Sequence, residues 1–167
     1  IQDLINNNSI EFIHANLLHV EAYEKAIQDS DHILHFAAET HVDRSISSGA
    51  EFVHSNVVGT FNLIESARSD LSKKIVLVST DEVYGSIDVG SWTEEMPLHP
   101  NSPYSASKAC AEIISKSYLN SFFKAKNLNL ATARAGNVIG GGDTAENRLI
   151  PDLIRGFKNS HKTVIRY

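Results

Sequence analysis

The chain has 167 residues, of which 42% are hydrophobic, and its formal net charge is −5. This length and composition predict one globular domain with a sizeable core. Acidic and basic residues are interspersed, so no basic stripe points to nucleic acid and no basic amphipathic face points to a membrane. No apolar run approaches the ~20 residues of a membrane span. The single Cys110, and first residues unlike a signal peptide, predict a reducing, cytoplasmic setting.

The first part of the chain alternates between strand-like and helix-like patterns. A short β-rich run lies within residues 9–17, and apolar residues at helical spacing follow over 20–30. Residues 32–38 are almost continuously apolar, which is typical of a strand covered on both faces. A long helix is expected over about 49–68, with a buried stripe formed by Phe52, Val53, Val57, Thr60, Leu63, Ile64 and Ala67.

The alternation continues in the rest of the chain. KIVLVST, residues 74–80, gives the clearest strand pattern, and residues 86–103 are expected to form an ordered loop. A second long helix over about 104–126 should begin near Ser102-Pro103, and we expect Cys110 to be packed within it. The remaining elements are expected to be a strand, a glycine-rich loop, a short helix and the start of a strand, at residues 129–135, 136–143, 149–159 and 163–167.

Strand–helix alternation with β-branched strands predicts an α/β fold with a doubly wound parallel sheet, as in Rossmann-like domains. In this architecture ligands bind beyond the carboxyl ends of the strands. The segments of interest therefore follow the strands, at residues 37–40, 79–82 and 135–137. All three are expected at one edge of the sheet.

A tyrosine and a lysine lie four residues apart in YSASK, at Tyr104 and Lys108. On a helix these positions share a face, so the ammonium can approach the phenol. A nearby cation lowers the pKa of tyrosine, which is ~10 when unperturbed, and makes it a base for an alcohol proton. Thr80, at a strand end, could hydrogen-bond the same alcohol. The spacing alone is weak evidence, because it also occurs on ordinary helix surfaces.

Two adjacent carboxylates, Asp81 and Glu82, follow the strand over 74–80. They could form a solvated turn. Their place at the expected ligand edge favours chemistry instead, because eliminating water needs one group to take a carbon-bound proton and another to protonate the departing hydroxyl. Oxidation of a sugar alcohol to a ketone acidifies the adjacent C–H. These residues therefore indicate oxidation followed by β-elimination.

Five stretches resemble the nucleotide-sugar 4,6-dehydratases, which are extended short-chain dehydrogenases. They are HFAAETHVDRSI, NVVGT, STDEVYG, SPYSASK and RLIP, at residues 35–46, 56–60, 79–85, 102–108 and 148–151. STDEVYG together with YSASK is most similar to the dTDP-glucose 4,6-dehydratases, whereas related epimerases typically lack the Asp-Glu pair. The resemblance implies an NAD-dependent hydro-lyase that converts NDP-glucose to NDP-4-keto-6-deoxyglucose.

The resemblance also implies a role for each catalytic residue. Tyr104 would take the O4 proton while hydride leaves C4 for NAD, and Thr80 would hydrogen-bond O4. Glu82 would remove the C5 proton, and Asp81 would protonate the C6 hydroxyl as water leaves. Hydride would then return to C6. Lys108 would hold the nicotinamide ribose and tune Tyr104.

Binding residues are implied in the same way. Besides Tyr104 and Lys108, those matching the NAD contacts are Asn16, Leu17, Phe36, Ala37, Ala38, Glu39, Thr40 and Ser55. Asn16 stands where the family usually has Asp, and its acceptor oxygen would keep a weaker contact with the adenine. Those matching the substrate contacts are Thr40, Thr80, Asn137, Arg148, Leu149, Ile150 and Pro151.

One family feature is missing, because no glycine-rich phosphate loop precedes Ala38. We therefore expect residues 1–167 to be a partial NAD-binding domain without its first β-α-β unit and without the C-terminal substrate lobe. The substrate-binding region would start at about 136–167. Such a fragment is expected to be inactive by itself.

Several alternatives remain open at this stage. The stretch over 134–152 is closer to the CDP-glucose 4,6-dehydratases, so the base of the substrate is undecided between dTDP and CDP. An epimerase or decarboxylase of the same fold, or a non-catalytic nucleotide-sugar-binding protein, would share most of the pattern. The eight histidines show no metal-ligand spacing, so no metal is expected. The resemblance implies a homodimer through the two long helices.

Overall fold

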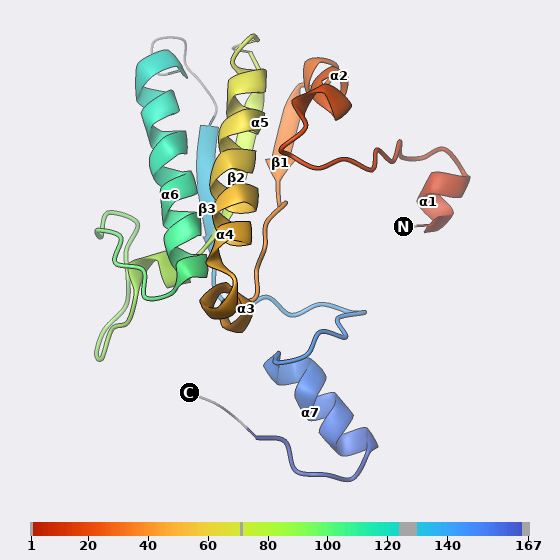
Figure 1. Ribbon diagram of the computed structural model, residues 1–167, viewed down its shortest axis with the longest axis vertical. Coiled ribbons are helices and arrows are strands. Elements are labelled where there is room, and N and C mark those ends of the chain that lie inside the picture. Colours follow the sequence, from red (N-terminus) through yellow and green to blue (C-terminus); the bar gives the residue numbers. More distant parts are fainter. Residues whose placement is uncertain (1, 71, 124–129, 165–167) are drawn as a thin grey trace. The chain divides into compact units, whose positions relative to one another are not determined.

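A parallel sheet forms the centre of the fold in the computed structural model, which describes residues 2–70, 72–123 and 130–164. Strands β1 (His32–His35), β2 (Lys74–Thr80) and β3 (Leu130–Ala135) pair in the order β1-β2-β3 (Figure 1). Helices connect the strands, so the predicted parallel α/β sheet is confirmed. The chain divides into two compact units, Ile1–Gly136 and Asn137–Tyr167, and the sheet belongs to the first.

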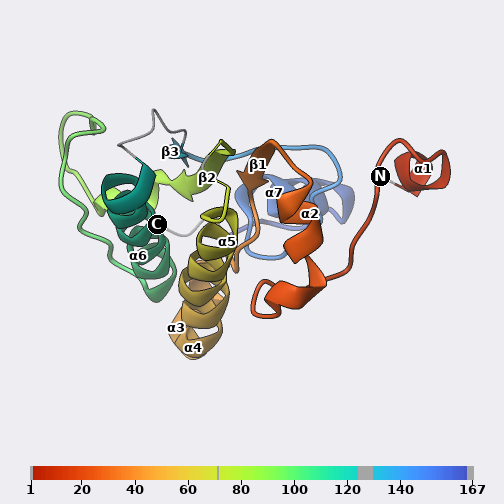
Figure 2. The same ribbon diagram turned by 90° about the horizontal axis from the view of Figure 1, so that it is seen from above.

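Helices α2 (Glu24–Gln28), α5 (Gly59–Ala67) and α6 (Pro103–Tyr118) lie on one face of this sheet (Figure 1, Figure 2). Burial along β1 consequently alternates, and Leu34 is 65% exposed. The expectation of a strand covered on both faces is therefore wrong for β1. The strand also ends at His35, earlier than predicted.

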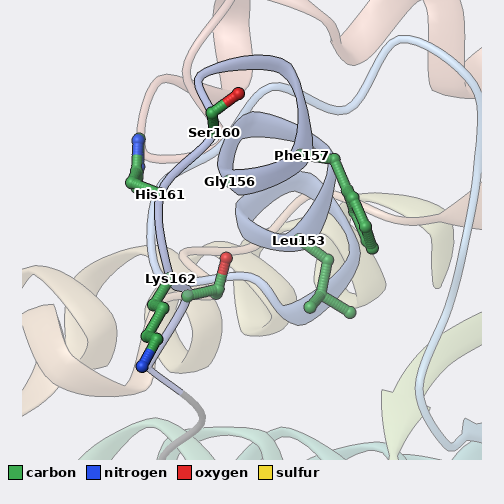
Figure 3. Close-up of a pocket in the computed structure, with 7 residues that line it drawn as sticks. Leu153, Gly156, Phe157, Ser160, His161 and Lys162 are labelled. Carbon is green, nitrogen blue, oxygen red and sulfur yellow. The ribbon is translucent and has the colours of Figure 1, made fainter.

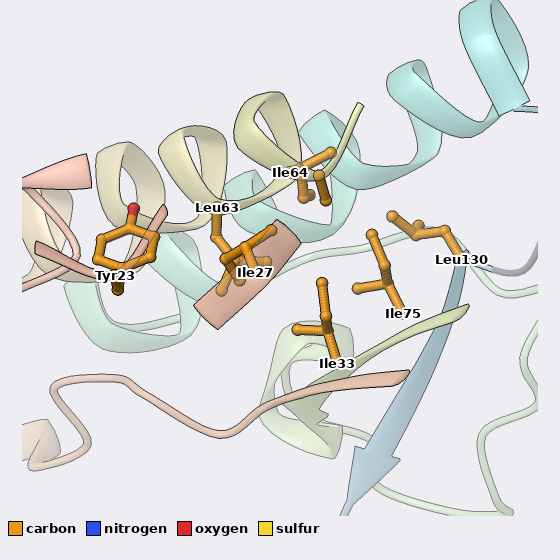
Figure 4. Close-up of a cluster of buried hydrophobic side chains, with 8 residues drawn as sticks. Tyr23, Ile27, Ile33, Leu63, Ile64, Ile75 and Leu130 are labelled. Carbon is orange, nitrogen blue, oxygen red and sulfur yellow. The ribbon is translucent and has the colours of Figure 1, made fainter. Parts of the chain in front are cut away.

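The apolar core lies between the helices and the first residues of the strands (Figure 4). Ile33, Ile75 and Leu130 are paired across the three strands, so their side chains form one row. Helices α2 and α5 cover that row with Ile27, Leu63, Ile64 and Ala67, and Tyr23, just before α2, joins them. Each fully buried aliphatic side chain of this kind stabilises the fold by about 1.5–3 kcal/mol.

The segment before α2 differs from the prediction. It contains α1 (Gln2–Asn6) and the 3₁₀ helix η1 (Val20–Ala22), while residues 11–16 have no regular structure, so the predicted β-rich run is wrong. A strand needs a partner for its backbone groups, and no described strand pairs with this run. The Leu17 carbonyl is instead bound by the Tyr23 hydroxyl at 3.0 Å and by Asn62 at 3.1 Å.

The first long helix is present but not uniform. After α3 (Val42–Ser47), it runs through α4 (Gly49–Phe52), the π-helical segment η2 (Val53–Val58) and α5. The wider π turn shifts the helical phase, because its hydrogen bonds join residues five apart. Val53, predicted to be buried, is 50% exposed, whereas Asn56 is buried. The other residues of the predicted stripe are buried or half-buried.

The second long helix begins as predicted. Ser102 caps α6 by accepting the Ser105 N–H at 3.1 Å, Ser105 returns the contact, and Pro103 is the first helical residue. The helix continues as η4 (Leu119–Phe123), and the predicted end at residues 124–126 lies outside the described residues. Cys110, expected to be packed, is exposed because α6 turns Ala109 and Ala111 towards the interior.

The second unit consists of a loop over residues 137–148 and α7 (Leu149–Lys158), which matches the predicted helix to within one residue. Arg155 holds the loop to the helix by donating to the Thr144 and Ala145 carbonyls at 2.8 and 2.9 Å, and it also pairs with Asp152 one turn earlier in α7. Residues 163–164 form no strand, and residues 165–167 of the predicted strand lie outside the described part of the chain.

Candidate active site

The two adjacent acids begin a 3₁₀ turn, η3 (Asp81–Tyr84), directly after β2. Thr80, the last residue of β2, accepts the Glu82 N–H through its hydroxyl at 3.2 Å and donates to Asp81 at 3.4 Å. Asp81 is half-buried and Glu82 is exposed. The acids are thus fixed by the end of a buried strand, at the edge of the sheet where the sequence places them.

Tyr104 and Lys108 lie one turn apart on the buried side of α6, which packs against β2 and η3. The Tyr104 ring meets Phe52 edge-on, with 6.3 Å between ring centroids. Lys108 is 4% exposed, and its ammonium donates to the Val78 carbonyl at 2.8 Å. Burial lowers the pKa of Lys108, and nearby Glu112 opposes that shift. An ammonium has three donors, so this geometry leaves capacity for a further acceptor.

A buried amide, which the sequence reasoning missed, joins the catalytic helix to the end of β1. Asn56, in η2, accepts the Glu39 N–H at 2.8 Å and donates to the Glu39 carbonyl at 2.9 Å. It also donates to the Ser107 hydroxyl at 2.8 Å, which in turn binds the Tyr104 carbonyl. A polar residue in the middle of an apolar helical stripe was the available signal.

The buried His35 is held neutral beneath this site. The single hydroxyl proton of Thr60 is donated to the Asn56 carbonyl at 2.6 Å, so the His35 Nε2 must be the donor in its 2.9 Å contact with Thr60. Burial, and then the charge of Lys108, lowers the pKa of His35 from 6.5 to about 4. At neutral pH, His35 therefore adds no second positive charge beside Lys108.

The residues predicted to bind a dinucleotide fall at several places in the first unit. Residues 36–40 follow β1 without regular structure, and the Phe36 side chain is 68% exposed. Ser55 is half-buried in η2. Asn16 uses its acceptor oxygen to bind the Leu18 N–H at 2.9 Å, and Leu17 packs against the apolar core. The adenine contact of Asn16 and Leu17 stays a prediction.

The residues predicted to bind the substrate nucleotide, Asn137 and 148–151, belong to the second unit. Arg148, Leu149 and Ile150 are exposed around the start of α7, and Pro151 is buried. A separate open hollow of about 470 Å³ lies beside the later turns of α7, with Leu153 and Phe157 on the helix and His161 and Lys162 on the segment after it (Figure 3). None of the predicted substrate residues lines this hollow.

The described residues contain neither a membrane span nor a metal-binding cluster. Within them, no helix is long and apolar enough to cross a membrane. No group of three or more His, Cys, Asp or Glu side chains in the same part of the chain could hold a metal ion.

Known proteins resemble this chain in sequence and in fold. The family model described as GDP-mannose 4,6 dehydratase matches residues 1–167. The chain belongs to this family. A dTDP-glucose 4,6-dehydratase of Streptomyces antibioticus is 42% identical over 132 residues, which is 79% of this chain and 38% of the relative. A CDP-glucose 4,6-dehydratase of Salmonella typhimurium is 39% identical over 141 residues, covering 80% and 39%.

Solved structures agree with the family assignment. A double mutant of dTDP-glucose 4,6-dehydratase from Streptomyces venezuelae, solved with NAD bound, superposes with a TM-score of 0.86 at 35% identity, over 95% of this chain and 48% of that one. A UDP-glucuronic acid 4-epimerase from Bacillus cereus gives 0.85 at 26% identity, over 98% and 50%. The chain spans about two fifths of the length of the curated relatives that it matches.

Proposed function

We propose that the protein containing this chain is a nucleotide-sugar 4,6-dehydratase that uses NAD, with dTDP-glucose favoured as its substrate. The observation that carries this proposal is the pair Asp81 and Glu82, which opens η3 next to the helix of Tyr104 and Lys108. The fold itself does not separate dehydratases from epimerases, since relatives of both kinds superpose equally well. The acid pair does, because epimerisation needs no elimination.

The donor groups at the carboxyl edge of the sheet fit a nicotinamide dinucleotide. Lys108 offers a buried ammonium with donors beyond its bond to Val78, which suits a ribose hydroxyl. Residues 36–40 present an exposed segment at the end of β1, fixed by the two bonds from Asn56 to Glu39. When bound, NAD would supply the temporary oxidation at C4 and the reduction at C6.

The side chains then divide the proton transfers between them. Tyr104 would accept the O4 proton, with Thr80 hydrogen-bonded to the same oxygen. Glu82, the more exposed acid, would take the C5 proton once the ketone has acidified it. Asp81, as the acid of this step, would give a proton to the C6 oxygen, so that the C6–O bond breaks and water leaves. Once hydride had returned to C6 and Glu82 had returned its proton to C5, the 4-keto-6-deoxy sugar and water would account for every atom of the starting hexose, and the O4 proton held by Tyr104 would replace the one given by Asp81.

The base of the nucleotide is best treated as a choice between two candidates. Relatives acting on dTDP-glucose and on CDP-glucose match this chain at 42% and 39% identity. Asn137 and residues 148–151 are the proposed contacts of the nucleotide. The decisive measurement offers dTDP-glucose and CDP-glucose in competition to the whole gene product and compares the two rates of product formation.

We further propose a cytoplasmic homodimer that joins through the two long helices. Large apolar side chains are exposed on the outward surfaces of these helices: Val53, Val58, Phe61, Ile113 and Phe122. Burying such side chains against a second copy would remove their apolar area from water. Sedimentation of the whole gene product should give a dimer, and Ile113→Glu should shift it towards monomer.

The proposed reaction is tested by analysing its product. NMR of the whole gene product with dTDP-glucose should show the 4-keto-6-deoxy sugar, with no net change in the redox state of NAD. An epimerase would keep its turnover when Asp81→Asn and Glu82→Gln are combined, whereas a dehydratase would stop after oxidation at C4. A protein that binds the sugar nucleotide in calorimetry but forms no product would be the non-catalytic alternative.

A further inference from the structure

A charged cluster that no step of the proposed reaction uses lies at the carboxyl end of the sheet. Arg134, on β3, donates from Nε to both oxygens of Glu112 at 3.1 and 3.0 Å and from Nη2 to one of them at 2.6 Å. The Glu112 side chain is 5% exposed and that of Arg134 is 20% exposed. A paired, bidentate contact of this kind is fixed in direction as well as distance.

The same guanidinium holds the last residue of the acid-bearing turn. Its Nη1 donates to the Tyr84 hydroxyl, and its central carbon lies 4.7 Å from the centroid of the Tyr84 ring. Tyr84 ends η3, while Asp81 and Glu82 begin it. The turn is therefore held at its start by Thr80 and at its end by Arg134.

The cluster also connects the turn to the catalytic helix. Glu112 lies one helical turn after Lys108 on α6, and the Ser79 hydroxyl donates to Glu112 from the end of β2. One arginine thus links β3, α6 and η3. Arg134 further donates to the Glu94 carbonyl at 3.3 Å, which ties the loop after η3 to the same point.

The residues proposed to assist oxidation have anchors of their own. Thr80 is paired with Ala135 in the β ladder, and Tyr104 sits in the first turn of the capped α6 against Phe52. The acids lie in η3, a turn of four residues that Thr80 caps at its start and Arg134 binds at its end. Loss of the contact with Arg134 should therefore disturb the acids more than Thr80 and Tyr104.

We propose that Arg134, acting through Tyr84, is a positioning residue for the elimination step. It holds the carboxylates of Asp81 and Glu82 in the positions from which they reach the C6 oxygen and the C5 proton of the sugar. This inference rests on the proposed dehydratase function. It assigns to Arg134 an effect on one step of the reaction, and a purely structural ion pair would have no such preference.

The first test uses Tyr84→Phe in the whole gene product, which removes the hydroxyl and keeps the ring. The matched control is Tyr118→Phe, which removes a hydroxyl that binds Glu65 at 2.7 Å on the other side of α6. In a single turnover with dTDP-glucose, absorbance of the reduced nicotinamide follows oxidation and its decay follows elimination and return. We expect oxidation to stay within about threefold and elimination to slow about tenfold or more in Tyr84→Phe alone.

The second test uses Arg134→Lys, which keeps one positive charge but cannot bind Glu112 and Tyr84 together. We expect the same preference for the elimination step, with a larger effect. Trp92 is the one tryptophan of the chain and stacks on Tyr84, with 5.8 Å between ring centroids. The part of the fluorescence that Trp92→Phe removes should change in Arg134→Lys and remain unchanged in Tyr118→Phe, reporting on the position of Tyr84.

The outcomes separate this inference from the function on which it rests. If the wild type forms no 4-keto-6-deoxy product, the proposed function is wrong and the inference falls with it. If the wild type forms product but Tyr84→Phe slows both steps equally or neither, only the positioning role is overturned. Tyr84→Phe decides the matter even if Arg134→Lys fails to fold.

Discussion

The two ends of the sheet differ in the polarity of their buried side chains. At the amino ends of the strands, Ile33, Ile75 and Leu130 form an apolar row under α2 and α5. At the carboxyl ends, the buried side chains include Ser79, Thr80 and Lys108. The hydrophobic end gains stability from area removed from water, whereas every buried polar group at the other end must find a partner.

This difference teaches where stability and chemistry are separated in the molecule. Strand β2, with seven residues, contributes to both stability and the proposed chemistry. Ile75 lies in the apolar core, and Thr80 caps η3, the turn that contains Asp81 and Glu82. A substitution at the apolar end should lower the free energy of unfolding without affecting the proposed reaction. The polar end cannot lose a partner without moving a group that the proposed reaction needs.

The largest expected effect is at the polar end, with Glu82→Gln. Loss of the proposed base should lower kcat by about 10²–10⁴-fold, because the amide cannot accept the C5 proton. Stability should be unchanged, because Glu82 is exposed. Product formation by NMR and urea unfolding measure the two properties. Glu95→Gln, in the exposed loop, is the control, and full turnover in Glu82→Gln would show that another group is the base.

The core end should respond in the opposite way to Ile75→Ala. Removing a side chain that is 2% exposed should cost about 2–5 kcal/mol in the free energy of unfolding, through lost burial and a residual cavity. Turnover per folded molecule should remain near that of the wild type. Val76→Ala, half-buried on the same strand, should cost less. A large fall in turnover without loss of stability would break the separation between the two ends.

The third prediction concerns pH and His35. Its pKa is about 4 in the folded protein, against the ordinary 6.5 in the unfolded chain, so above pH 6.5 both states are neutral and stability is complete. As the pH falls, the unfolded state binds a proton first, and up to about 3 kcal/mol is lost between pH 6.5 and 4. His35→Gln should unfold with a shallower pH dependence over this window. Urea unfolding of this variant and of His32→Gln, an exposed neighbour, checks the origin of the effect.

The smallest expected effect is at the start of the catalytic helix. Ser102→Ala removes the cap of α6 and should cost about 1 kcal/mol in the free energy of unfolding. Ser117→Ala, near the other end of the same helix, should cost less because its hydroxyl binds only a local carbonyl. Equal losses in the two variants would mean that the cap contributes nothing beyond an ordinary surface contact.

The sequence predicted those parts of the fold that depend on local pattern. The bounds of β2 and the start of α6 were predicted correctly, because an apolar run and a Ser-Pro cap can be recognised from consecutive residues. The π-helical segment η2 was missed, since no composition marks it. The run over 9–17 was predicted as a strand on its local pattern, although strand formation depends on a distant partner.

The candidate site shows the same division. Asp81, Glu82, Tyr104 and Lys108 could be proposed from the sequence because the two members of each pair lie within four residues of each other. Asn56 bonds to Ser107, 51 residues away, and Arg134 bonds to Glu112 across 22 residues. Partners at such separations are chosen by the packed structure, so a single sequence contains no local pattern that would reveal them.

The two hydrogen bonds between the Asn56 side chain and the Glu39 backbone determine which substitutions this sequence can tolerate during evolution. Both of its bonds to position 39 are made to the backbone N–H and carbonyl, and neither uses the Glu39 side chain. These two bonds can therefore be kept by any residue at position 39 except proline, which lacks the N–H. The segment after β1 is held instead by the side-chain amide of Asn56, which lies 17 residues further along the chain.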